Sequence, residues 1–194
     1  MRFTPLEIAG AMSVDVEPHP DSRGLFARTY CLQEFGRHGI GAPVVQASTS
    51  YNEKMGTLRG MHMQWPPSSE GKLVRCVRGA IFDVLLDMRP ESPTFLRHQG
   101  LRLDEDSRAA VFIPPGIAHG FLTLKDRTEV FYQMTDYHAP ELATGFRWND
   151  PAFSIHWPAP VAVISLRDAE YPDFNPAEFR DEYRRRSLAA KAAD

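Results

Sequence analysis

Proline and glycine recur along the whole chain and divide it into short segments. The 194 residues include 16 prolines and 13 glycines, spread from end to end. Segments between such breaks are short, and several alternate apolar and polar residues, which is typical of strands. This pattern predicts an all-β domain rather than a helical one.

The clearest strand pair is expected over residues 72–88, as a hairpin that turns at Arg78 and Gly79. Its second arm has one apolar face, which consists of Phe82, Val84, Leu86 and Met88. Because side chains alternate along a strand, Asp83 and Asp87 belong to the opposite face. Acids at such places either line a ligand cavity inside a barrel or lie on a solvated face.

Further strands are expected at residues 111–113, 120–124, 129–134 and 161–165, and a short helix at residues 31–38. A second helix is expected to begin after Asn175, which can cap it, with Pro176 in the first position and Glu178 completing a capping box. No repeat or linker is found. We therefore expect one domain over residues 1–194, with a helical tail over residues 175–194.

The charge of the chain excludes some partners. Lys and Arg number 22 and Asp and Glu number 25, which gives a formal net charge of −3. Nothing in this balance attracts nucleic acid or a membrane, so phosphate binding needs a local basic cluster. The first residues form no apolar signal-peptide run, and Cys31 and Cys76 suggest no disulfide framework. A cytoplasmic protein is expected.

Two histidines lie in segments that could carry chemistry. Residues 115–120 resemble the second sequence motif of cupins, in which a turn brings a histidine, here His119, to the mouth of a barrel. Many cupins hold a metal with this histidine, a His-x-His pair and a carboxylate. Here residues 61–64 supply only His62, and a metal site needs at least three suitably placed donors. We predict no metal and no cofactor.

A longer resemblance covers most of the chain. Residues 58–64, Leu-Arg-Gly-Met-His-Met-Gln, resemble the Leu-Arg-Gly-x-His-x-Gln signature of the dTDP-4-dehydrorhamnose 3,5-epimerase family. Similar segments follow in the family's order at residues 71–74, 83–89, 92–95, 113–121, 131–132, 135–137, 148–151 and 165–168. The resemblance implies a cupin-like jelly-roll barrel with short peripheral helices and a C-terminal helix. It also implies a homodimer whose N-terminal segment reaches the partner's site.

The family's reaction accounts for these residue types. Hydrogens beside the ketone of a nucleotide-linked 4-keto-6-deoxyhexose are acidic, so a base can remove one to give an enolate, and an acid can return a proton to the other face. Carbon 3, carbon 5 or both can be inverted in this way, and dTDP-4-dehydro-6-deoxyglucose is the expected substrate. The resemblance implies these roles: His62 as base, Asp168 as its partner, Tyr132 as acid, Lys72 near the enolate oxygen, and Arg59 and His119 around the phosphates and sugar.

Departures from the family pattern cluster on the nucleotide side. The family's Arg-Gly-x-Phe segment, here Arg23 to Phe26, is followed by a base-contacting glutamate, whereas this chain has Arg28. The other changed or neighbouring positions are Gln46, Ser48, Tyr137, His138 and Ala143. Arg28 is a donor only, so either the preference for the nucleotide base has changed or Arg28 turns outward.

Two rival functions remain at this level. One is a metal-dependent cupin isomerase or oxygenase, which metal analysis would reveal. The other is a cupin that binds sugar nucleotides without catalysis, which the presence of His62, Asp168 and Tyr132 argues against.

Overall fold

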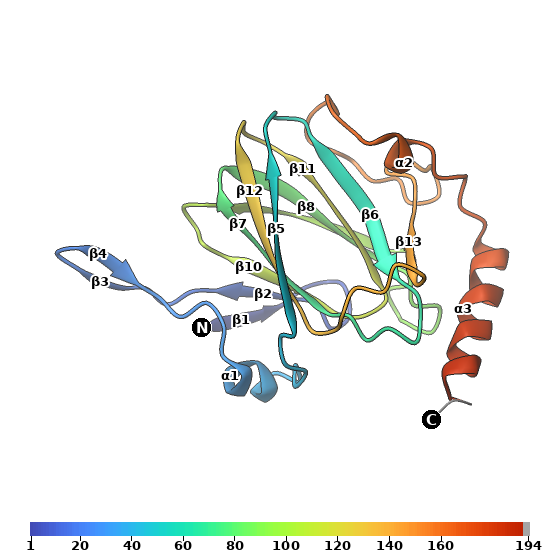
Figure 1. Cartoon of the computed structure of the whole chain (residues 1–194), viewed down its shortest axis with the longest axis horizontal. Coiled ribbons are helices and arrows are strands. Elements are labelled where there is room, and N and C mark those ends of the chain that lie inside the picture. Colours follow the sequence, from blue (N-terminus) through green and yellow to red (C-terminus); the bar gives the residue numbers. More distant parts are fainter. Residues whose placement is uncertain (192–194) are drawn as a thin grey trace.

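The computed structural model describes residues 1–191, whose strands form two facing antiparallel sheets and a separate two-stranded ribbon (Figure 1). The first sheet contains, in spatial order, β1 (Arg2–Pro5), β2 (Met12–Asp15), β10 (Ala110–Ile113), β7 (Lys72–Arg78), β12 (Thr128–Met134) and β5 (Gln46–Asn52). The second contains β13 (Ala143–Gly145), β6 (Leu58–Gln64), β11 (Ile117–Thr123), β8 (Ala80–Asp87) and β9 (His98–Asp104). The ribbon pairs β3 (His19–Asp21) with β4 (Gly24–Phe26).

The main core lies between the two sheets. Val74 and Val130 from the first sheet pack with Ile81, Leu85 and Phe121 from the second, and all are buried. These residues alternate along their strands with residues on the outer faces, as expected for a sandwich in which both sheets turn one face inward. The expected all-β, jelly-roll type of fold is confirmed.

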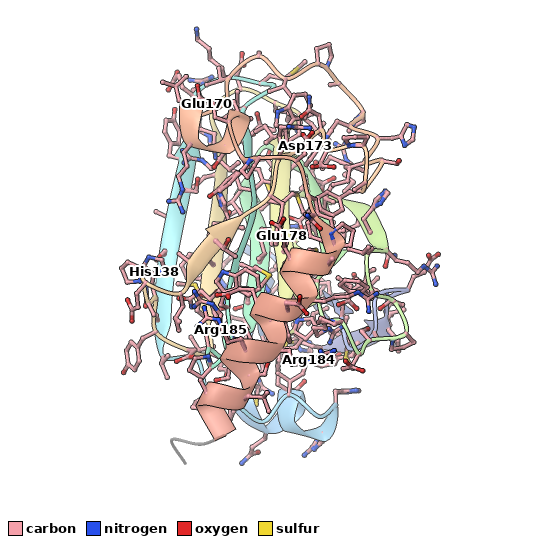
Figure 2. The ribbon with its side chains drawn as sticks, turned by 90° about the vertical axis from the view of Figure 1, so that its right-hand side faces the viewer. His138, Glu170, Asp173, Glu178, Arg184 and Arg185 are labelled. Atoms are coloured by element: carbon pink, nitrogen blue, oxygen red, sulfur yellow. The ribbon has the colours of Figure 1, made fainter. Side chains whose placement is uncertain are left out.

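Each sheet is covered on part of its outer face by a helix. Helix α3 (Pro176–Lys191) lies against the second sheet (Figures 1 and 2). Its Phe179 and Tyr183 belong to one apolar cluster with Val84 and Leu86 of β8. Helix α1 (Leu32–Arg37) lies against the first sheet, where Phe35 packs in one cluster with Leu73 and Phe112. Burial of these apolar faces holds both helices in place.

Both expected helices are present, and the cap of α3 is confirmed. Asn175 Oδ1 accepts a hydrogen bond from the backbone N–H of Ala177 at 3.1 Å, and Asn175 Nδ2 donates to Glu178 Oε1 at 2.7 Å. This interaction satisfies backbone groups that lack a partner at a helix start. The last part of the expected tail, residues 192–194, lies outside the described residues.

The expected hairpin over residues 72–88 is wrong, although both strands exist. β7 pairs with β10 and β12 in the first sheet, whereas β8 pairs with β9 and β11 in the second. The chain crosses between sheets at Gly79, whose φ is +79° and whose missing side chain leaves space for Thr128. A strand–glycine–strand pattern looks alike whether the glycine turns a hairpin or a corner between sheets, so sequence alone could not distinguish them.

The structure differs from expectation at residues 161–165, and it also decides where Asp83 and Asp87 lie. Residues 161–165 form no strand, but only an isolated bridge between Val163 and Thr57. Neither Asp83 nor Asp87 is solvated, since both side chains are fully buried. Asp87 is paired with Arg89 at 2.7 Å and accepts hydrogen bonds from Ser92 and Thr94, which makes its burial tolerable. Asp83 faces the barrel interior.

Among the described residues, none of the helices has the length and apolar character needed to span a membrane.

Candidate active site

A cavity of about 860 Å³ opens between the two sheets and collects most of the candidate residues. Eight of those identified from sequence line it: Ser48, Arg59, His62, Lys72, His119, Tyr132, His138 and Asp168. They come from both sheets, from the loop after β12 and from helix α2 (Leu166–Ala169). The fold therefore brings together side chains that are as much as 120 positions apart in the sequence, as Ser48 and Asp168 are.

His62 and Asp168 are in direct contact in this cavity. His62 Nε2 lies 2.7 Å from Asp168 Oδ1, which is the contact expected from sequence. The carboxylate is buried, while the imidazole is partly open to the cavity. Burial by itself raises the pKa of Asp168. The hydrogen bonds that its carboxylate makes with His62, Gly60 and Ser165 lower the pKa and outweigh burial, so the pKa lies below the usual 3.8. Asp168 is therefore an ionised partner for an imidazole that gains a proton.

The position of Asp168 is set by the short helix α2, which sequence analysis did not identify. Ser165 precedes this helix, and its hydroxyl accepts a hydrogen bond from the Asp168 N–H at 3.1 Å. The Gly60 N–H donates to Asp168 Oδ2 at 3.4 Å from β6. The carboxylate is thus held from its own helix and from the strand that carries His62.

His119 has a similar carboxylate partner. Its Nε2 lies 2.7 Å from Asp83 Oδ1, and both side chains are buried. His119 and His62 are cross-strand neighbours in the pairing of β11 with β6, so their side chains share the inner face of the second sheet. Asp83 Oδ2 has no hydrogen-bond partner among the described residues.

Tyr132 lies on the opposite wall, because β12 belongs to the first sheet and β6 to the second. Its ring is 6.0 Å from that of His119, centroid to centroid, in an edge-to-face arrangement. Burial raises the pKa of the Tyr132 phenol well above 10.0, and the charge of Asp83 raises it further, while Arg59 opposes the shift. The hydroxyl is thereby kept protonated at neutral pH.

Lys72 and Arg59 bring positive charge to the cavity. Lys72 Nζ is paired with Glu70 Oε2 at 2.6 Å, and both side chains are largely buried. Arg59 is more exposed, and its Nε donates to Asn52 Oδ1 at 2.8 Å. Arg167, on α2, also lines the cavity and donates from Nε to the Tyr171 hydroxyl at 2.9 Å. Three cations at one cavity suit a substrate that carries phosphates.

Comparison with known proteins gives the family of this chain. The family model described as dTDP-4-dehydrorhamnose 3,5-epimerase matches residues 5–176. The chain belongs to this family. A dTDP-4-dehydrorhamnose 3,5-epimerase of Sinorhizobium fredii is 37% identical over 173 residues, which are 89% of this chain and 89% of that protein. A dTDP-4-dehydrorhamnose 3-epimerase of Streptomyces niveus is 37% identical over 172 residues, which are 88% of this chain and 82% of that protein.

Solved structures of the epimerase family have the same fold. The crystal structure of dTDP-4-dehydrorhamnose 3,5-epimerase from Bacillus anthracis, with TDP and PPi bound, is similar with a TM-score of 0.86 and 32% sequence identity. The similarity covers 89% of this chain and 99% of that one. The resemblance found from the sequence is therefore confirmed at the level of family and fold.

Five candidate residues of this family member do not line the cavity of their own chain. Arg23 and Phe26 lie on the β3–β4 ribbon and Arg28 follows it, and this ribbon projects away from the sheets (Figure 1). Arg28 is paired with Glu34 of α1 at 2.5 Å. Gln46 and Tyr137 also lie outside the cavity lining.

His138 and Gln46 lie together at the edge of the cavity. Gln46 Oε1 accepts a hydrogen bond from the His138 N–H at 3.1 Å, and this contact joins the start of β5 to the loop after β12. Figure 2 shows His138 at the side of the molecule, away from α3. A smaller pocket of about 170 Å³ adjoins the cavity there and is lined in part by Ala143, one of the expected departures from the family pattern.

Several residues of the epimerase site were not singled out from sequence. Glu70, Asn52 and Ser165 are partners of the expected residues, and Arg167 lines the cavity beside them. Ser165 and Arg167 had a usable sequence signal, because both lie with Asp168 in the segment 165–168 that resembles the family. A hydrogen-bond partner that is distant in sequence has no local pattern.

The metal-binding potential of residues 1–191 is limited. Within this range no three His, Cys, Asp or Glu side chains converge on a point that could hold a metal ion. His62 and His119 each direct Nε2 to a carboxylate.

Proposed function

We propose that this chain epimerises a dTDP-linked 4-keto-6-deoxyhexose at carbon 3, carbon 5 or both, with dTDP-4-dehydro-6-deoxyglucose as the expected substrate. The observation that carries the proposal is the single cavity in which the His62–Asp168 pair faces Tyr132 across two sheets. Membership of the epimerase family supports the same reaction.

His62 is the proposed base. The ionised Asp168 at 2.7 Å stabilises the imidazolium that forms when His62 takes the proton. A hydrogen bond to the carboxylate fixes the ring and leaves the other ring nitrogen available to accept a proton. Such orientation by a buried carboxylate is the arrangement that general-base histidines commonly need.

Tyr132 is the proposed acid. Inversion at a carbon requires that the proton leaves from one face and returns to the other, so the base and the acid must lie on opposite sides of the sugar. β6 and β12 supply these two sides because they belong to different sheets. A phenol that burial keeps protonated carries the proton that it is proposed to donate to the enolate.

Lys72 is the proposed stabiliser of the enolate. An ammonium with three N–H donors retains two of them when one is directed to Glu70. Positive charge at the developing oxygen lowers the barrier most effectively in a site that excludes water. Arg59 and His119 are assigned to the phosphates and the sugar.

Dimerisation is part of the proposal. Phe26 is 75% exposed on the β3–β4 ribbon, which is unusual for a large apolar side chain on a projecting element. In a homodimer, Arg23, Phe26 and Arg28 would reach the partner's cavity with the ribbon. Sedimentation measurements test this, and Phe26→Ala is expected to weaken dTDP binding. A cytoplasmic location stays a prediction from the sequence.

The function is tested by incubating the protein with dTDP-4-dehydro-6-deoxyglucose in deuterated water and following carbons 3 and 5 by NMR. Relatives named as 3,5-epimerase and as 3-epimerase have the same 37% identity to this chain, so both carbons must be observed. Deuterium incorporation at one or both carbons, without added cofactor, supports the proposal. Tight binding of dTDP with no exchange at either carbon would indicate a non-catalytic sugar-nucleotide-binding protein instead.

A further inference from the structure

Glu70 forms a largely buried ion pair with Lys72 at the wall of the cavity. The Lys72 ammonium lies 2.6 Å from Glu70 Oε2, and the two side chains are only 16% and 8% exposed. Lys72 lines both the main cavity and the adjoining pocket of about 170 Å³, whereas Glu70 lines only the smaller pocket. Lys72 therefore borders both hollows, while its carboxylate partner borders only the smaller one.

Hydrogen bonds hold the backbone on both sides of Glu70. The Gly71 N–H donates to Thr135 Oγ1 at 2.8 Å, and the Thr135 N–H donates to the Gly71 carbonyl at 2.9 Å. The Ser69 N–H donates to Asp136 Oδ2 at 2.9 Å. A side chain at Gly71 would lie 3.1 Å from the Phe112 ring, so the backbone there has little room to shift. Glu70 is thus held on rigid backbone.

A lysine side chain has four rotatable bonds, and its ammonium binds a substrate oxygen well only if its position is fixed beforehand. We propose that Glu70 is a positioning residue for Lys72: it fixes the ammonium at the cavity wall and leaves two N–H donors directed toward a substrate oxygen. The inference rests on the proposed function, because it concerns the group assigned to the enolate.

Other titratable and charged groups line the same two cavities as Lys72. His62 of β6, His138 of the loop after β12 and Arg167 of α2 line the smaller pocket together with Lys72. Asp168, His119 and Tyr132 lie in the main cavity. Among the ion pairs of the described residues, the one that includes Lys72 is made with Glu70. The substitution Glu70→Gln removes this charge with almost no change of shape.

The test compares kcat and KM of the unmodified protein, Glu70→Gln, Lys72→Met and the double variant. The loss of a hydrogen-bonded ionic partner predicts a fall in kcat of roughly tenfold to a hundredfold for Glu70→Gln, with KM and dTDP affinity nearly unchanged. In the Lys72→Met background the same substitution is expected to have little further effect, because the two residues act as one unit. Glu105→Gln is the matched control, since Glu105 forms an exposed pair with Lys125.

The outcomes separate this inference from the proposed function. An inactive unmodified protein contradicts the function itself. An active protein with normal kcat in Glu70→Gln, or with the same loss in both backgrounds, overturns the role of Glu70 alone. If Glu70→Gln does not fold, Glu70→Asp replaces it: the charge is kept but its reach is shortened, so kcat should fall less. Full kcat in Glu70→Asp also contradicts the positioning role.

Discussion

His62 and His119 are directly opposite one another on β6 and β11, and each has a buried carboxylate 2.7 Å from its Nε2 atom. Asp168 comes from helix α2 and Asp83 from the neighbouring strand β8. The two pairs differ in access: the His62 ring is partly open to the cavity, whereas His119 is 6% exposed. This difference favours His62 as the residue that takes a proton from the substrate.

Replacing His62 by Asn should reduce the rate of epimerisation by about 10²–10⁴-fold, the usual contribution of a general base. Affinity for dTDP should change little, because the proposed role of His62 concerns the sugar and not the nucleotide. Solvent-deuterium incorporation, followed by NMR, measures the base step directly. Near-normal incorporation in His62→Asn would exclude this residue as the base.

Asp168→Asn tests the carboxylate partner of His62 through the stability of the protein. The folded-state pKa of Asp168 is lowered, so the ionised carboxylate stabilises the protein at pH values above its ordinary pKa of 3.8. This contribution is lost as the pH falls through the lowered folded-state pKa. The stability difference between the unmodified protein and Asp168→Asn should therefore shrink in acid, as the pH falls through the lowered folded-state pKa. Urea unfolding across this range measures it, and a pH-independent difference would contradict the assignment.

Tyr132→Phe should separate the two halves of the reaction. The substitution removes only the hydroxyl, so His62 can still form the enolate, and exchange with solvent should survive better than net inversion. The comparison requires exchange and product formation to be measured on the same samples. Equal loss of both would argue against Tyr132 as the acid on the opposite face.

Removal of metal should leave turnover unchanged. The proposed proton transfers use His62 and Tyr132 and involve no redox change, so dialysis against a chelator should not lower kcat. Loss of turnover that a single divalent ion restores would instead support a metal-dependent cupin.

Arg28→Glu should shift the preference for the nucleotide base toward thymine, and so toward dTDP. The resemblance implies a base-contacting glutamate at the position of Arg28, and a donor-only side chain would leave the thymine ring N–H without an acceptor. Such an unpaired group costs about 1–3 kcal/mol, which corresponds to roughly a tenfold to hundredfold preference. Competitive binding of dTDP, UDP, CDP and GDP to both proteins measures this.

The control for that experiment is Arg37→Glu, which makes the same charge change at the exposed end of α1. If the unmodified protein already prefers dTDP and Arg28→Glu changes nothing, Arg28 serves only its pair with Glu34.

Gly60→Ala should destabilise the protein beside the site. The φ of Gly60 is +128°, and an added Cβ would overlap Gly120 and lie 2.9 Å from the His119 carbonyl. Such strain costs of order 1–3 kcal/mol. Gly41→Ala is the control, because nothing lies within 4 Å of its added Cβ. Urea unfolding of the two variants should differ by this amount, and equal midpoints would contradict the explanation.

The sequence by itself determined the strand content, the capped C-terminal helix and the chemical types present in the site. Proline and glycine spacing and the alternation along residues 80–88 are local signals, and local backbone preferences act over a few residues. The same is true of the segment around His62, whose order and spacing identified the family. These features needed no knowledge of which strands are neighbours.

Only the tertiary structure decided which strands pair and which polar groups meet. β7 and β8 are adjacent in sequence yet lie in different sheets, and so do β6 and β12, which carry His62 and Tyr132. The pairs Asp83–His119 and Glu70–Lys72 likewise depend on burial, which makes an uncompensated charge costly and so selects a partner in space. Strand pairing and burial are properties of the whole folded chain, and no local pattern in the sequence encodes them.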